Sequence, residues 1–235
     1  MMNLRKFTGL LSLLLIVSAC GDAVEISIEM DDDANSTQSA AQQQDGWTML
    51  FDGKTLHGWN VQNTDTWLVE DGVLTVKAKG DIWTQQQYGN FVFECDFKIS
   101  PECNSGIFIR TGDTENEVQT GMEIQILDGT YDPKSMRNAC GAVYDCLAPT
   151  EVVVKAPGEW NTTRITCRNN MINVVMNDVP IISMDVDKWV TPSQNPDGTP
   201  NKFKNAIKDF PRSGYIGFQY HGHPVWFRNI RIKEL

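Results

Sequence analysis

The strongest constraint on the fold is a series of short segments in which apolar and polar residues alternate. A period of two places one face of a strand in a core and the other face toward solvent. Turn-forming pairs such as Asp71-Gly72 and Asn169-Asn170 separate neighbouring segments, as in antiparallel hairpins. The alternating segments are residues 73–76, 91–97, 106–110, 122–126, 163–167, 171–176, 215–220 and 225–232. Only residues 201–209 have the character of a short helix. We therefore predict an all-β fold, a two-sheet antiparallel jelly-roll sandwich.

The first 20 residues have the layout of a secretory signal peptide. Arg5 and Lys6 precede an apolar run that ends at Val17-Ser18-Ala19-Cys20. This run is shorter than the ~20 residues that a membrane-spanning helix needs. Its last four residues have the lipobox pattern of bacterial lipoproteins, in which cleavage leaves a diacylated cysteine as the first mature residue. We expect an exported lipoprotein anchored to a membrane through Cys20, on the periplasmic or the cell-surface side. The alternative is an ordinary signal peptide with an incidental cysteine.

Residues 21–45 form an acidic segment without alternation. They carry a formal charge of −7 and include no Lys or Arg. Such a composition buries too little apolar surface to offset the entropy of ordering, so we expect a disordered tether. The whole chain has a net charge of −10, and residues 46–235 retain −5 of it. This mildly acidic remainder is long enough for one domain and lacks the basic surface of a nucleic-acid-binding protein. No feature of it calls for an obligate protein partner.

Six cysteines are present, and Cys20 is assigned to lipid. The other five, Cys95, Cys103, Cys140, Cys146 and Cys167, would enter an oxidising compartment. Since five is odd, at least one thiol is unpaired in a monomer, and the connectivity of the rest stays open. No pair has C-x-x-C spacing, which argues against a structural zinc site.

Several segments together resemble the 3-keto-disaccharide hydrolase family across the whole mature domain. They are residues 47–59 (WTMLFDGKTLHGW), 67–74 (WLVEDGVL), 104–110 (NSGIFIR), 121–128 (GMEIQILD), 158–161 (GEWN) and 221–232 (HGHPVWFRNIRI). The resemblance implies the fold of concanavalin A-like lectins and glucanases, in agreement with the predicted jelly roll. It also implies a small carbohydrate substrate.

The segment from Glu123 to Asp128 carries the first candidate chemistry. On a strand, Glu123 and Gln125 point to one face and Ile124 to the other, so the two polar side chains would line a cleft. The spacing resembles the Glu-x-Asp-x-x-Glu motif of laminarinase-like glucanases, with Glu123 at the nucleophile position and Asp128 at the acid/base position. Gln125 cannot titrate, and in a regular strand Asp128 would lie about 16 Å from Glu123, at ~3.3 Å per residue, and on the opposite face. Retaining glycoside hydrolysis requires two carboxyl groups about 5–5.5 Å apart. Only a bulge would bring Asp128 to the face of Glu123.

Three further residues complete the polar candidates. Arg110 would share a face with Phe108, and its guanidinium would orient Glu123 or bind substrate. His221 and His223 stand two residues apart and share a face in an extended segment, where they would serve as a general base or as metal ligands. The family often has Asp at the position of His223. Each of these side chains also has a purely structural interpretation.

Trp83, Tyr144 and Trp226 are candidate platforms for a sugar ring, because the C–H faces of a pyranose pack against aromatic rings. Aromatic side chains occupy cores more often than binding sites, so this role competes with packing.

Three functions remain open. The first, which the family resemblance implies, is cleavage of 3-keto-glycosides, in which a base removes the acidified C2 hydrogen and the C1 leaving group departs. This chemistry needs one base and an enolate stabiliser, and it would accommodate a divalent metal as cofactor. The second is a lectin-like carbohydrate-binding module. The third is a classical glucanase using Glu123 and Asp128.

Overall fold

The computed structural model describes residues 43–61, 66–130 and 134–235. The predicted signal peptide, the lipid position Cys20 and most of the predicted acidic tether therefore lie outside the described residues. Within the described part of the chain, no helix is both long enough and apolar enough to cross a membrane.

Two antiparallel sheets make up the fold. The five-stranded sheet has the order β3-β6-β13-β8-β9, and the nine-stranded sheet contains the path β1-β2-β14-β7-β10-β11-β12, with β5 pairing both β14 and β4. The five-stranded sheet comprises β3 (Trp59–Val61), β6 (Ile82–Thr84), β13 (Tyr215–Phe218), β8 (Asn104–Thr111) and β9 (Met122–Leu127). The nine-stranded sheet comprises β1 (Gln43–Gln44), β2 (Trp47–Met49), β4 (Trp67–Glu70), β5 (Val73–Val76), β7 (Phe91–Ile99), β10 (Trp160–Arg168), β11 (Met171–Met176), β12 (Val179–Asp185) and β14 (Val225–Glu234).

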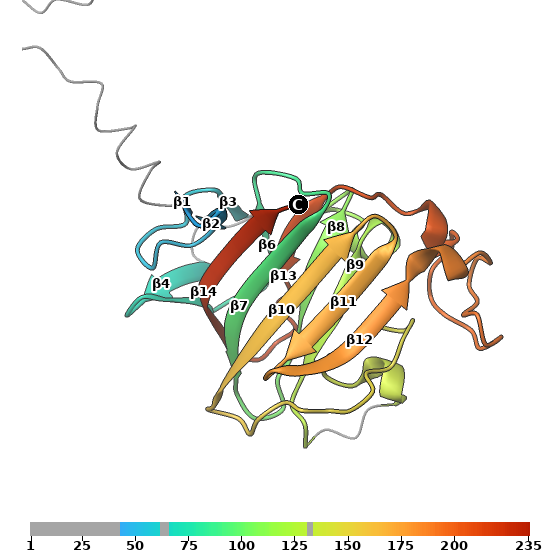
Figure 1. The fold of residues 1–235 in the computed structure, drawn as a ribbon. Helices are drawn as coiled ribbons and strands as arrows, with labels where there is room; N and C mark the ends of the chain where they lie inside the picture. The colour runs from blue at the N-terminus through green and yellow to red at the C-terminus, as the bar shows by residue number, and fades with distance from the viewer. Residues whose placement is uncertain (1–42, 62–65, 131–133) are drawn as a thin grey trace, which may run out of the picture.

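The two sheets stack face to face, as Figure 1 shows, with β10, β7 and β14 in front and β8, β9 and β13 behind. Along β7, alternate residues are buried and half-buried, so one face of the strand enters the core. Between the sheets, the rings of Phe218 on β13 and Phe227 on β14 stack with their centroids 3.9 Å apart. The predicted all-β, two-sheet jelly-roll sandwich is confirmed, and all eight alternating segments lie in strands or overlap them.

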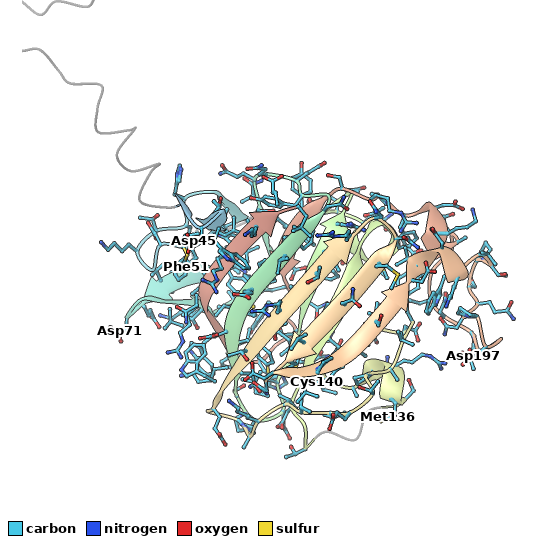
Figure 2. All side chains as sticks on the ribbon, in the orientation of Figure 1. Asp45, Phe51, Asp71, Met136, Cys140 and Asp197 are labelled. Atoms are coloured by element: carbon cyan, nitrogen blue, oxygen red, sulfur yellow. The ribbon has the colours of Figure 1, made fainter. Side chains whose placement is uncertain are left out.

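Hairpin turns form where the turn-forming pairs predict them. Asp71 and Gly72 have φ of 51° and 78° and join β4 to β5, and Asn169 has φ of 51° between β10 and β11. Asp45 and Gly46, with φ of 54° and 77°, join β1 to β2 in the same way. Figure 2 marks Asp45 and Asp71 at these turns. Positive φ at both central residues matches the twist of a two-residue hairpin, and Asp-Gly accepts it at low cost. The sheet thus begins at Gln43, inside the segment predicted as tether.

In the described part of the chain, helical structure is confined to short turns: α2 (Glu117–Thr120), η1 (Met136–Asn138), η2 (Val186–Lys188) and η3 (Ile207–Asp209). The last of these is the part of residues 201–209 that becomes helical. The rest of that segment is an irregular loop, which carries one of the site residues described below.

The five cysteines of the domain are all free and buried. Burial raises the pKa of each thiol; for Cys103, Cys140 and Cys167 it reaches about 12. Cys140 and Cys146, which are close in sequence, are not bridged. Buried thiols of this kind behave as small apolar core residues with little thiolate character.

Candidate active site

A polar pocket of about 430 Å³ opens beside the five-stranded sheet, on the face turned away from the core. Both carboxylate and lysine side chains line it. The lining residues are Lys79, Gly80, Asp81, Asn104, Glu117, Val118, Glu123, Gln125, Tyr144, Lys202, Gln219, Tyr220 and His221. Four of the nine residues proposed from the sequence, Glu123, Gln125, Tyr144 and His221, meet in this pocket.

A second hollow of about 460 Å³ lies on the outer face of the nine-stranded sheet. Its main charges neutralise one another: Glu94 pairs with Arg164 and Arg231, and Asp96 with Arg228. No buried, unpaired charge is left there for chemistry, so the pocket beside the five-stranded sheet is the candidate active site.

Strand alternation delivers Glu123 and Gln125 to the pocket, as predicted. Ile124 and Ile126, on the other face of β9, are fully buried in the core. The facing strand β8 makes room for the carboxyl group by a glycine. Gly106 pairs with Gln125, and a Cβ built on Gly106 would lie 2.3 Å from Glu123 Oε1. The carboxyl of Glu123 therefore lies directly over the backbone of β8.

Glu123 is buried, with 8% of its surface exposed. Burial raises the pKa of Glu123 to about 7; the positive charge of Lys202 opposes this rise, and the negative charges of Asp81 and Glu117 add to it. No hydrogen bond to its carboxyl group is found among the described residues. A carboxyl group with a pKa near neutrality exchanges a proton readily, which is the property of a general base.

Gln125 is fixed by its neighbour on β8. Its Nε2 donates to Asn104 Oδ1 at 2.8 Å, while its buried Oε1 has no hydrogen-bond partner in the described structure. An unpaired buried acceptor is costly, so this amide oxygen suits a hydroxyl group of a ligand. Asn104 belongs to a segment that carries the family resemblance, but no local pattern marks it as a site residue.

Tyr144 stands next to Glu123 because the two backbones are joined. The N–H of Tyr144 donates to the carbonyl of Glu123 at 2.9 Å, and Val143 forms an isolated bridge with Ile124. Burial raises the pKa of the Tyr144 hydroxyl, and the charge of Glu123 adds to this rise. Lys202 Nζ lies 3.9 Å from the centroid of the Tyr144 ring. The Tyr144 ring therefore holds the ammonium group of Lys202 in the pocket that contains Glu123.

On the other side of the pocket, Asp81 and His221 lie together. Asp81 Oδ1 accepts a hydrogen bond from the backbone N–H of Tyr220 at 2.9 Å. Burial raises the pKa of Asp81 to about 6; this hydrogen bond and the charge of His221 lower it, and the charge of Glu117 raises it. Asp81 precedes β6, three strands from β9, which separates the two backbones by about 14 Å at ~4.8 Å per strand. Asp81 and His221 thus line one side of the pocket and Glu123 the other.

The expectation that Arg110 shares the face of Phe108 and reaches Glu123 is not met. Arg110 has φ of 50° where the pairing of β8 with β13 shifts register, so the bulge redirects its side chain. Its guanidinium donates to the carbonyls of Gly89 and Asn169, both at 2.8 Å, and to Asn90 Oδ1 at 3.2 Å. The contacts tie β8 to two turns and lie outside the pocket.

Asp128 also lies outside the pocket. It follows the end of β9, and its carboxylate accepts hydrogen bonds from the N–H of Glu102 at 2.8 Å and of Thr130 at 3.0 Å. Burial would raise the pKa of Asp128, but these two hydrogen bonds outweigh it and hold the pKa below its usual range. The bulge that would have returned Asp128 to the face of Glu123 is absent from β9, so Asp128 fastens a loop.

The remaining sequence-derived candidates are distributed around the molecule. Trp83 is buried beside Phe108, with ring centroids 5.2 Å apart. It lies in the same cross-strand row as Phe108 and Glu123 but does not line the pocket. Trp226 lies in the nine-stranded sheet with Lys98 Nζ 4.8 Å from its ring, far from the pocket lining. His223 does not line the pocket, and its buried Nδ1 has no hydrogen-bond partner within the described residues.

Four charged residues of the pocket were not anticipated from the sequence: Lys79, Asp81, Glu117 and Lys202. They come from loops and from the single turn α2, where no periodicity points to a face. Among the described residues, no group of three or more His, Cys, Asp or Glu side chains is placed to hold a metal ion.

The fold and the pocket define a jelly-roll protein with an enclosed, proton-exchanging carboxyl group. Residues 46–233 match the 3-keto-alpha-glucoside-1,2-lyase-like domain, and the chain belongs to this family. The resemblance found in the sequence is thereby confirmed. A 3-keto-disaccharide hydrolase of Bacteroides thetaiotaomicron is 28% identical to this chain, over 81% of this chain and 79% of its own length.

Solved structures agree with this assignment. A provisionally assigned glycosyl hydrolase of Parabacteroides distasonis superimposes with a TM-score of 0.77 and 37% identity, over 80% of this chain and 99% of its own. A β-glucanase of Bacillus licheniformis superimposes with a TM-score of 0.50 and 12% identity, over 82% of this chain and all of its own. At that identity the glucanase shares the fold alone.

Proposed function

We propose that this protein cleaves glycosides that carry a ketone at C3 of the sugar, with Glu123 as the base that removes the C2 hydrogen. Membership of the family and the activity named for the Bacteroides relative support the substrate class. The observation that carries the role of Glu123 is its burial on the polar face of β9 with a pKa of about 7. A base with that pKa is half ionised at neutral pH and retains enough basicity to accept a carbon-bound proton.

The reaction proceeds through an enolate. Breaking the C2–H bond transfers the proton to Glu123 and leaves the electron pair shared between C2 and the C3 oxygen. As the ketone re-forms, this pair makes a C1–C2 double bond, the C1–O bond breaks, and the aglycone oxygen takes a proton. Addition of water across the double bond places a hydroxyl group on C1 and a proton on C2. Release before water addition is a lyase reaction, and release after it is net hydrolysis.

His221 and Asp81 are suited to the second proton transfer. The aglycone must gain a proton as it leaves, and water must lose one as it adds to C1. His221 lines the pocket beside Asp81, whose pKa of about 6 allows it to exchange a proton near neutrality. Asp81 precedes a strand three places from that of Glu123, and His221 follows a strand two places from it, so the two sides of the pocket would serve C2 and the C1 oxygen separately. Gln125 and Tyr144 would contact hydroxyl groups and the ring face of the sugar.

A glucanase mechanism with Glu123 and Asp128 has less support, because Asp128 is committed to the amides of Glu102 and Thr130. A lectin has no need of a buried carboxyl group without a hydrogen-bond partner, since such a group costs free energy to maintain. Cleavage through an enolate needs only one base, and the single buried carboxyl group of Glu123 would supply it.

The test compares a 4-nitrophenyl 3-keto-glucoside with the parent 4-nitrophenyl glucoside, using the mature protein with and without chelator. We expect nitrophenol only from the ketone, and a loss of about 10²–10⁴ in rate for Glu123→Gln. Glu151→Gln, a change at an exposed carboxylate outside the pocket, is the matched control. Equal cleavage of both glycosides would establish the glucanase, and binding without cleavage of either would establish the lectin. Loss of activity with chelator would add a metal ion to the mechanism.

The site of action is proposed to be a membrane surface outside the cytoplasm. This rests on the signal peptide and on the lipobox that ends at Cys20. The lipid would hold the domain near the membrane through residues 21–42, and soluble sugars would reach the pocket from the surrounding compartment.

A further inference from the structure

We propose that Lys202 binds the C3 carbonyl oxygen of the substrate and takes up the negative charge of the enolate, which makes it the residue that distinguishes a ketone from a hydroxyl group. This inference rests on the proposed function. Lys202 lies in the irregular loop between η2 and η3, and its ammonium group lines the same pocket as Glu123.

The backbone of Lys202 is fixed although the residue is exposed as a whole. Its N–H donates to Asp145 Oδ2 at 2.8 Å, and its carbonyl accepts from Gln119 Nε2 at 3.1 Å. Oε1 of the same Gln119 accepts a hydrogen bond from the N–H of Lys204 at 2.8 Å. Next in the chain, Phe203 is buried against Phe210, with ring centroids 5.7 Å apart. These contacts hold the lysine at one position on the rim of the pocket.

The side chain of Lys202 is directed by Tyr144. Its Nζ lies 3.9 Å from the ring centroid of Tyr144, and the backbone of Tyr144 is hydrogen-bonded to that of Glu123. A cation over an aromatic face is held there by the ring quadrupole. Burial lowers the pKa of Lys202, while the charges of Glu123 and Asp145 oppose this shift. The ammonium group of Lys202 and the carboxyl group of Glu123 therefore attract each other within the pocket.

The chemistry requires a positive group at this place. When Glu123 takes the C2 proton it becomes neutral, and the charge that it carried moves to the C3 oxygen. A fixed cation beside the base stabilises the product of that step more than its reactant, which is the condition for catalysis. The charge of the other lysine of the pocket, Lys79, is not among those that shift the pKa of Glu123.

The experiment separates enolate formation from cleavage. The probe is a 1,5-anhydro-3-keto-hexitol, which has an acidic C2 hydrogen but no leaving group at C1. Exchange of that hydrogen for deuterium is followed by NMR in D₂O, alongside nitrophenol release from the 3-keto-glucoside. For Lys202→Met, and for Lys202→Gln as a more soluble second variant, we expect both rates to fall by about 10²–10³. Lys204→Met removes the same charge from the same loop outside the pocket, and we expect it to match the wild type.

The outcomes distinguish this inference from the proposed function. If the wild type exchanges and cleaves, and a folded Lys202 variant does so within threefold of it, the role of Lys202 is refuted and the function stands. If the wild type neither exchanges nor cleaves, both fail. A larger rise in KM than fall in kcat would assign Lys202 to ground-state binding and also refute enolate stabilisation. Thermal unfolding of each variant, compared with Lys204→Met, shows that the fold is intact.

Discussion

The carboxyl group of Glu123 on β9 fills the space that a side chain at Gly106 on β8 would need, because a methyl group on Gly106 would lie 2.3 Å from Glu123 Oε1. Gly106→Ala must therefore displace the carboxyl group. We expect a loss of about 10² or more in kcat/KM, because a positioned base loses most of its effect when it moves by about 1 Å. The backbone of Gly106 is not in the left-handed region, so the fold should survive. Gly89→Ala, where the added methyl would meet its nearest atom at 3.6 Å, is the control. Normal turnover by a folded Gly106→Ala protein would contradict the placement of Glu123.

The activity should depend on pH through Glu123. Its carboxyl must be ionised to accept the C2 proton, so kcat/KM for the 3-keto-glucoside should rise tenfold per pH unit below pH 7 and level off above it. The measurement is a pH profile of nitrophenol release at substrate concentrations well below KM, where the rate is proportional to kcat/KM. A profile that is flat from pH 5 to pH 8 would remove Glu123 from the role of base.

Stability should depend on pH in the opposite direction. The pKa of Glu123 is raised from 4.5 to about 7 in the folded protein, so its contribution to stability is complete below pH 4.5 and is lost as the pH rises through 7. The full shift corresponds to about 3 kcal/mol. Glu123→Gln removes this dependence. Urea unfolding of wild type and variant at pH 5 and pH 8 should show the variant gaining stability relative to the wild type at the higher pH. A constant difference at both pH values would exclude a raised pKa.

Arg110 should matter for stability and not for turnover. Its guanidinium donates three hydrogen bonds, to Gly89, Asn90 and Asn169, that join β8 to two turns. Arg110→Met removes all of these hydrogen bonds, which a buried charged group donates, and we expect a loss of about 2–4 kcal/mol in the free energy of unfolding. Arg164→Met, at an exposed ion pair, should lose less than about 1 kcal/mol. The kcat of the folded Arg110→Met protein should equal that of the wild type. A large fall in kcat without loss of stability would return Arg110 to the active site.

Cys20 should carry the lipid anchor. We expect Cys20→Ser to move the protein from the membrane fraction to the soluble fraction, because diacyl chains supply the binding energy. Mass spectrometry of the wild-type N-terminal peptide should show the acylated cysteine. Equal membrane association of wild type and variant, with no acylated peptide, would leave an ordinary signal peptide as the explanation.

Much of the fold follows from local pattern. The alternation through β7, β9, β10 and β11 identifies strands and their buried faces, since a strand has a fixed period of two. Asp71-Gly72 and Asn169-Asn170 locate hairpins because few residues accept positive φ. The alternation does not predict β1, β2, β3, β4, β6 or β12, because the first five span only two to four residues and β12 contains Pro180.

The candidate site, like the fold, can be predicted only in part from local sequence pattern. The alternation within β9 is enough to predict that Glu123 and Gln125 share a polar face, because that relation lies within one strand. The residues that surround them depend on contacts between distant parts of the folded chain. Arg110 leaves the site because a bulge reverses its direction, and no local pattern announces a bulge. Lys202 and Asp81 enter it because loops distant in sequence are held by contacts such as Asp145 with Lys202 and Tyr220 with Asp81. Loop residues have no periodicity, and their positions depend on partners that only the folded chain brings together.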